Sequence, residues 1–127
     1  MKTTDEALRL RRTLHRNAEL SGSEEHTSGI LHAYLERLEP VRLVRGLGGH
    51  GLAAVFGRQG SGPRTLVRCE LDALPIPERA GEPDPSMTAG VSHRCGHDGH
   101  MAIVAALAGM LSEEPPASGT VTLLFQP

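Results

Sequence analysis

The chain has 127 residues, with 13 Lys and Arg against 15 Asp and Glu, a formal net charge of −2 and 39% hydrophobic residues. This length allows one ordinary domain or part of a larger one, and the near-neutral charge argues against general nucleic-acid binding, which needs a basic face. Aromatic residues make up only 2% of the chain. A base-stacking surface is therefore excluded, and the core must come from Leu, Val, Ile and Ala.

The apolar stretches are too short for a membrane span. The longest runs from residue 101 to 111, whereas a spanning helix takes about 20 residues. The N-terminus carries acidic residues early and lacks the apolar segment of a secretory signal. Without an export signal, Cys69 and Cys95 are predicted to be reduced thiols. The sequence therefore predicts a soluble, cytoplasmic protein that binds neither membranes nor nucleic acid.

The first part of the chain predicts two helices. Residues 5–20 place apolar side chains near one helical face and arginines near another. Ser21 and Glu24 fit a capping box, as N-cap and N3 residues, for a second helix with apolar residues at helical spacing. We expect this second helix to stop at Pro40.

Three short strands are predicted next, at 41–44, 52–56 and 65–71. The glycines of the Gly-Gly-His-Gly segment 48–51 permit a tight turn into the second strand. The third strand is mostly apolar, which is typical of a strand covered on both faces.

A long loop and two further elements complete the chain. Residues 72–91 contain four prolines, and a loop of this length in a compact domain tends to be functional or disordered. Residues 97–114 predict a helix that Pro115 and Pro116 end, and residues 120–126 predict a last strand. The order helix–helix–strand–strand–strand–helix–strand predicts an α/β fold.

A dense group of metal-ligand types occupies residues 93–100. It comprises three imidazoles, one thiol and one carboxylate: His93, Cys95, His97, Asp98 and His100. Each type binds borderline divalent ions such as zinc, manganese, cobalt or nickel. Any one of these residues alone is more often structural, but this density has no packing explanation. Cys95 also precedes a predicted helix start, where the partial positive charge favours the thiolate that binds metal.

Two carboxylates lie at the end of the third predicted strand. Glu70 and Asp72 are two residues apart and so point to one face, at the strand end where α/β sheets gather their ligands. Asp72 could bind a metal or orient a ligand. A competing interpretation is a thiol nucleophile at Cys95 with a base beside it. We place it below metal binding, because pairing Cys95 with His97 requires an unusual backbone.

Five segments resemble one family in the right order. Residues 14–21 (LHRNAELS) resemble its LHxxPELS segment, 48–51 (GGHG) its GGTG turn, and 68–75 (RCELDALP) its RADMDALP segment. Residues 93–100 (HRCGHDGH) resemble HACGHDGH, and 121–127 (VTLLFQP) resemble VxLIFQP. This is the amidohydrolase branch of the co-catalytic metallopeptidases, which includes hippurate hydrolase, aminoacylase-like enzymes and auxin-conjugate hydrolases.

The resemblance implies a three-layer zinc-peptidase-like α/β domain that cleaves the amide of N-acyl amino acids or similar conjugates. Two divalent ions, manganese, zinc, cobalt or nickel, would activate water and polarise the amide carbonyl. The family's metal-binding thiolate and histidine match Cys95 and His97. Its strand-end aspartate matches Asp72, in a supporting role, while Asp98 and His100 match positions that support the site. Glu70 replaces the aspartate of RADMD, which keeps a carboxylate.

In the family, FQP is followed by two glutamates that supply the general base and a metal ligand, and these positions would lie beyond Pro127. We therefore expect residues 1–127 to be the N-terminal part of the catalytic domain, without the lid and dimerisation domain and the C-terminal half. The site would then be incomplete and the chain alone inactive, whereas the complete protein would be a homodimer or homo-oligomer. Two alternatives remain: a non-catalytic subunit or remnant that binds metal or a partner, and a thiol-dependent hydrolase using Cys95.

Overall fold

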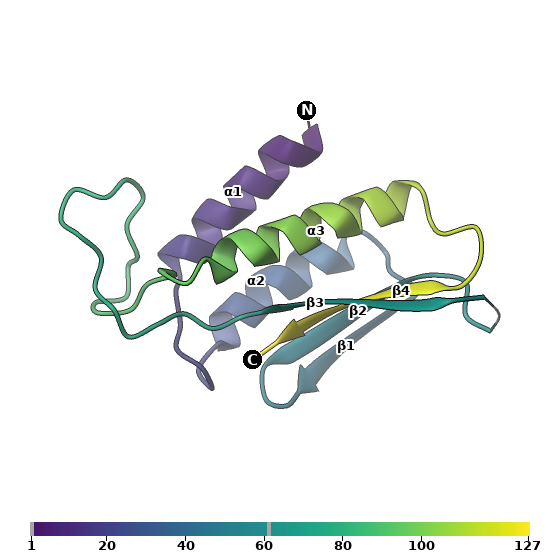
Figure 1. The fold of residues 1–127 in the computed structure, drawn as a ribbon, viewed down its shortest axis with the longest axis horizontal. Coiled ribbons are helices and arrows are strands. Elements are labelled where there is room, and N and C mark those ends of the chain that lie inside the picture. The colour runs from purple at the N-terminus through teal and green to yellow at the C-terminus, as the bar shows by residue number, and fades with distance from the viewer. Residues whose placement is uncertain (1, 61) are drawn as a thin grey trace.

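The computed structural model describes residues 2–60 and 62–127. The elements are α1 (Lys2–Arg16), α2 (Glu25–Glu36), β1 (Arg42–Leu47), β2 (Gly51–Gly57), β3 (Arg64–Glu70), α3 (His97–Glu113) and β4 (Thr120–Gln126) (Figure 1). Their order confirms the predicted α/β arrangement. The bounds of β4 are those expected from the sequence, and α3 ends one residue earlier than expected.

The strands form one mixed sheet in the order β1-β2-β4-β3. The β2 strand is antiparallel to both β1 and β4, while β3 runs parallel to β4. The last residues of β3 and β4, Glu70 and Gln126, are register partners. The carboxyl ends of the two parallel strands therefore lie side by side.

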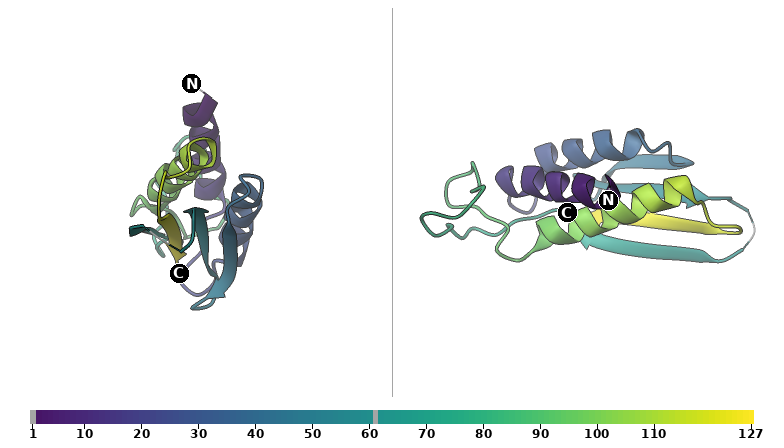
Figure 2. Two further views of the ribbon diagram at one scale, coloured as in Figure 1. Left: turned by 90° about the vertical axis from the view of Figure 1, so that its right-hand side faces the viewer. Right: turned by 90° about the horizontal axis from the view of Figure 1, so that it is seen from above.

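All three helices lie on one side of the sheet (Figures 1 and 2). Helices α2 and α3 contact the strands directly, whereas α1 packs mainly against α3. The core between these layers is aliphatic apart from two phenylalanines and a tyrosine, as the composition requires. Its buried members include Leu14, Leu31, Leu35, Leu52, Phe56, Met101, Ala105, Leu123 and Phe125.

The prediction that the third strand is covered on both faces is wrong for the described residues. The β3 strand is an edge strand, and Leu66 is 59% exposed. Cys69 is the one fully buried residue of β3, and its side chain belongs to the core between the sheet and the helices. The opposite side of β3 meets no described element.

Helix α1 ends at Arg16 rather than at residue 20. The backbone N–H and the side-chain amide of Asn17 both donate to the Thr13 carbonyl and close the last turn. The chain then runs extended, so that Leu20 forms a bridge with Ala73 at the start of the long loop. Helix α2 likewise stops at Glu36, before Pro40, and Glu39 turns the chain with a φ of 52°.

The predicted capping box is also wrong. Helix α2 begins at Glu25, its N-cap is Glu24, and no side chain of that N-cap bonds the helix. The Glu19 carboxylate caps the helix instead. It accepts the backbone N–H groups of His26, at 3.2 Å, and Thr27, at 2.6 Å, and also the Thr27 hydroxyl at 2.6 Å. An acceptor outside the helix thus satisfies the free donors of its first turn.

The predicted long loop is confirmed and extends from β3 to α3. Its two ends are tied together, because Leu74 and Ser92 exchange two backbone hydrogen bonds of 3.0 Å each. The Ser92 hydroxyl also donates to the Ile76 carbonyl at 2.6 Å. Between these ties the loop projects beyond the sheet, on the side of the α1 C-terminus (Figure 1). No helix among the described residues is long and apolar enough to cross a membrane.

Candidate functional site

The candidate site lies where β3 ends and α3 begins. Glu70 is the last residue of β3, and His97 is the first residue of α3. Gly96 precedes the helix in the left-handed region, with a φ of 86°, a conformation that a glycine adopts without strain. Because the Leu74–Ser92 pair closes the loop between these points, the segment after β3 meets the segment before α3.

His97 contacts both carboxylates that the sequence singled out. Its Nε2 lies 2.6 Å from Oε2 of Glu70, and its Nδ1 lies 3.1 Å from Oδ1 of Asp72. Nδ1 is also 2.8 Å from the Asp72 carbonyl oxygen, with which the Cys95 thiol makes a longer contact of 3.9 Å. The structure therefore brings Cys95, His97, Glu70 and Asp72 together at the carboxyl end of β3.

The donor types at this point suit a borderline divalent ion, since thiolate, imidazole and carboxylate all bind zinc and its neighbours. The arrangement supplies part of a coordination shell. Across residues 2–60 and 62–127, no three His, Cys, Asp or Glu side chains are placed to hold one ion. His97, at 18% exposure of its side chain, and the half-buried Cys95 are accessible to a ligand.

Pro127 lies at the same edge of the sheet as this group. It directly follows Gln126, the last residue of β4, and the Gln126 carbonyl accepts the Leu71 N–H at 2.8 Å. The end of β4 therefore lies beside the segment that carries Glu70 and Asp72.

The other predicted site residues lie apart from this group. His100 is exposed, and its ring centroid is 5.9 Å from that of His97. Asp98 is buried and faces α1, where it accepts hydrogen bonds rather than meeting Glu70 or Asp72. His93 is 4% exposed, and neither ring nitrogen has a hydrogen-bond partner among the described residues. Burial lowers the pKa of His93 to about 4, so its ring is neutral at pH 7.

The second cysteine plays no part in this group. Cys69 is buried in β3, and burial raises the pKa of its thiol to about 12. Both cysteines are free in the structure, as the sequence predicts. Cys95 is therefore the thiol available for chemistry.

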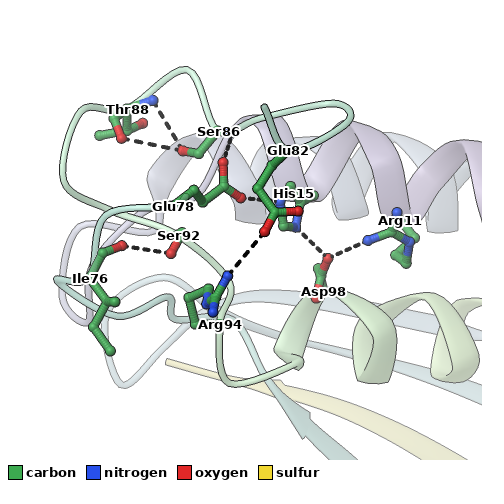
Figure 3. A network of polar contacts seen from close by, with 10 residues as sticks. All are labelled: Arg11, His15, Ile76, Glu78, Glu82, Ser86, Thr88, Ser92, Arg94 and Asp98. Carbon is green, nitrogen blue, oxygen red and sulfur yellow. Dashed lines mark hydrogen bonds and ion pairs between the residues drawn. The ribbon is translucent and has the colours of Figure 1, made fainter. Parts of the chain in front are cut away.

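A polar network beside the site was not predicted by the sequence analysis. His15 Nδ1 lies 2.9 Å from Oδ2 of Asp98, and its Nε2 contacts a carboxylate oxygen of Glu78 (Figure 3). Arg11 donates to the same Asp98 oxygen at 2.9 Å. Arg11 and His15 are four residues apart and so share one face of α1, but their common partner Asp98 is 87 and 83 positions away in the sequence.

The same network holds the long loop. The Ser86 backbone N–H donates to Glu78 at 2.7 Å. Burial raises the pKa of Glu78, but the hydrogen bonds from Ser86 and His15 outweigh it and hold the pKa of that carboxyl below its usual value. Further along α1, Arg16 pairs with Asp84 and its carbonyl accepts the Met87 N–H. One face of α1 thus anchors both the loop and the first turn of α3.

Comparisons with known proteins agree with this fold. Residues 66–127 match the Peptidase family M20/M25/M40. The chain is 41% identical over 119 residues to a Rhodococcus jostii protein named as a glutamate–cysteine ligase, covering 92% of this chain and 14% of that protein. It is 39% identical over 120 residues to IAA-amino acid hydrolase ILR1-like 6 of Arabidopsis thaliana, covering 94% of this chain and 25% of that protein.

A solved structure extends the likeness to the whole described fold. The Bacillus subtilis YXEP protein, described as a dinuclear metal binding peptidase of the M20 family, matches with a TM-score of 0.91 and 31% identity. The match covers 99% of this chain and 35% of that one. The α/β fold of the chain is thus the fold of part of an M20-family structure. The chain is thus similar to the Peptidase family M20/M25/M40 in the sequence of residues 66–127 and to an M20 structure in its fold, and it spans between 14% and 35% of the length of these relatives.

Proposed function

We propose that this chain carries part of the site of a metal-dependent amidohydrolase that cleaves the amide of N-acyl amino acids or similar conjugates. The observation that carries the proposal is the convergence of Cys95 and His97 with Glu70 and Asp72 at the end of β3. The match of residues 66–127 to this peptidase family supports the hydrolase class, and the name of the Arabidopsis relative supports an amino-acid conjugate as substrate.

In this proposal Cys95 and His97 are metal ligands, and two divalent ions occupy the complete site, in line with the dinuclear metal binding described for the YXEP protein. Bound metal supplies an activated water and polarises the amide carbonyl. Asp72 orients His97 through Nδ1, by its backbone carbonyl at 2.8 Å and its carboxylate at 3.1 Å. This leaves Nε2, which lies beside Glu70, as the ring nitrogen that would hold an ion.

We further propose that the 127-residue chain alone is inactive, because its described residues gather only part of a metal shell. The complete site would come from a protein region that follows Pro127 in the family pattern and supplies a general base and the remaining ligands. Loss of a general base alone lowers rates by about 10²–10⁴.

The test is an assay of N-acetyl and N-benzoyl amino acids with added manganese, cobalt or zinc. It is run on the chain alone and after mixing with a second chain that begins Ala-Glu-Glu and supplies the rest of the family fold. Activity only in the mixture, abolished by chelator and by Cys95→Ala, is the expected result. Turnover that survives chelation but is lost on Cys95 alkylation would instead establish a thiol-dependent hydrolase.

A further inference from the structure

The side chain of His15 joins two segments that are far apart in the sequence. Its Nδ1 meets Asp98, in the first turn of α3, and its Nε2 meets Glu78, in the long loop. All three side chains are largely removed from water, with exposures of 16% for His15, 5% for Asp98 and 9% for Glu78. Figure 3 shows the ring between the two carboxylates.

Both ring nitrogens of His15 face a carboxylate oxygen. An ionised carboxylate only accepts hydrogen bonds, so His15 donates to both partners only when both ring nitrogens carry a proton. The Arg11 guanidinium, which is always charged, donates to the same Asp98 oxygen at 2.9 Å. Charge-assisted hydrogen bonds of this kind are short, directional and stronger than neutral ones. The network therefore fixes the direction of the Asp98 side chain.

The start of α3 depends on this contact, because it has no local cap. Its N-cap is Gly96, which has no side chain to bond the free N–H groups. An aspartate in the first turn can stabilise a helix by its favourable interaction with the helix dipole. The carboxylate of Asp98, however, points to α1 and contacts Arg11 and His15. Backbone bonds close the turn before the helix, from Gly96 N–H to His93 and from His100 N–H to Gly96, each 3.1 Å. The side-chain contacts of Cys95 and His97 in this segment go to Asp72, so the network around Asp98 is what fastens the first turn of α3 to α1.

Asp98 directly follows His97 in the sequence. A rotation of the first turn that moves Asp98 away from α1 must also move the His97 ring relative to Glu70 and Asp72. We propose that His15 is a positioning residue: by holding Asp98 against α1, it sets the orientation of His97 and Cys95 toward their metal. Because the same ring also contacts Glu78, it connects the long loop to the first turn of α3. The inference rests on the proposed metal-binding role of Cys95 and His97.

The experiment is a titration of the full chain with Co²⁺, which reports thiolate ligation by its charge-transfer absorption. His15→Gln is compared with His26→Gln, the same change at an exposed histidine of α2. Among the described residues, His26 bonds Glu19 through its backbone N–H and its ring has no hydrogen-bond partner. We expect His15→Gln to weaken Co²⁺ binding by about tenfold and to change the spectrum of the saturated complex, as outer partners of metal ligands do. His26→Gln should stay within about twofold of the parent chain.

A metal-free measurement accompanies the titration. Hydrogen exchange at the Ser86 and His100 amides should be faster in His15→Gln, since Glu78 and the first turn of α3 lose their anchor. A folded His15→Gln chain with the parent affinity, spectrum and exchange rates would overturn the inference. If the parent chain gives no Cys95-dependent absorption, the proposed metal role fails, and unchanged exchange would then separately overturn the positioning role.

Should His15→Gln not fold, Arg11→Gln provides the second variant. Arg11 is more exposed, at 37% of its side chain, and its replacement removes one of the two donors to Asp98 while leaving His15 in place. A severalfold weaker Co²⁺ affinity of Arg11→Gln supports the inference, and an affinity equal to that of the parent chain overturns it.

Discussion

Nε2 of His97 lies 2.6 Å from Oε2 of Glu70, so the first residue of α3 meets the last residue of β3. A ring nitrogen that is to bind a metal must leave this contact, whereas Nδ1 keeps its partner at the Asp72 carbonyl. The geometry therefore predicts weak binding by this chain. Two ligands fall short of the three or four that zinc sites need.

Metal removal tests this arrangement directly. We expect Zn²⁺ or Co²⁺ to bind the chain reversibly and to be removed by chelator, and Cys95→Ala to weaken binding at least about tenfold. Isothermal titration calorimetry measures both affinities. Cys69→Ala is the control, since that thiol is buried away from the site. Tight stoichiometric binding that survives loss of both Cys95 and His97 would contradict the ligand assignment.

The two thiols should differ sharply in alkylation. Cys69 is 4% exposed and its pKa is raised to about 12 by burial, so it is neither accessible nor ionised at pH 8. Cys95 is half-buried and lies at the helix start. Iodoacetamide followed by peptide mass spectrometry should label Cys95 first, and added Zn²⁺ should slow only that reaction. Equal labelling of both thiols in the native chain would refute the difference.

Glu19, rather than the predicted capping box, should stabilise α2. Its carboxylate accepts two backbone N–H groups and the Thr27 hydroxyl. We expect Glu19→Ala to lower the free energy of unfolding by about 2 kcal/mol, the upper part of the range for lost caps and charged hydrogen bonds. Ser21→Ala, at the exposed residue that the capping-box pattern favours, should change it by less than about 0.5 kcal/mol. Urea unfolding of both variants decides between the two caps.

The order of these elements could be predicted from the sequence because hydrophobic periodicity is local. The meeting of Glu70 and Asp72 with Cys95 and His97 was foreseeable too, since strand ends gather ligands in α/β sheets. The Glu19 cap was not, because its acceptor lies outside the helix, eight residues before Thr27. The capping-box pattern covers only an N-cap residue and the Glu or Gln three residues after it.

The His15 network was beyond sequence reasoning for a stronger reason. His15 and Asp98 are 83 positions apart, and their contact exists only because α1 packs on α3. A single histidine on an amphipathic helix gives no sign of such a partner. The exposure of β3 was likewise hidden, because an apolar strand has the same sequence whether or not neighbouring elements cover it.

The uncovered side of the sheet should make the chain self-associate. Leu66 is 59% exposed on β3, an edge strand, and exposed apolar strand surfaces promote pairing between chains. In analytical ultracentrifugation at equal protein concentration, Leu66→Lys should have a lower average molecular mass than the parent chain. Leu8→Lys, at the 47% exposed Leu8 of α1, should not. A monomeric parent chain that unfolds cooperatively in calorimetry would contradict this expectation.

The final prediction concerns acid stability of the loop. Burial raises the pKa of Glu78, but Ser86, His15 and the more distant Arg94 favour the ionised form and keep that pKa below its usual 4.5 in the folded chain. A lowered folded-state pKa means that the unfolded chain binds more protons near pH 4.5. The stabilisation is therefore complete above that pH and is lost as the pH falls through the folded-state value. Glu78→Gln removes this contribution, so its unfolding free energy should fall less steeply than that of the parent chain below pH 4.5. Chemical unfolding at a series of pH values measures both slopes, with Glu36→Gln, at an exposed residue of α2, as the control that should retain the parent slope. Parallel pH profiles for the parent chain and Glu78→Gln would show that this carboxylate does not anchor the loop.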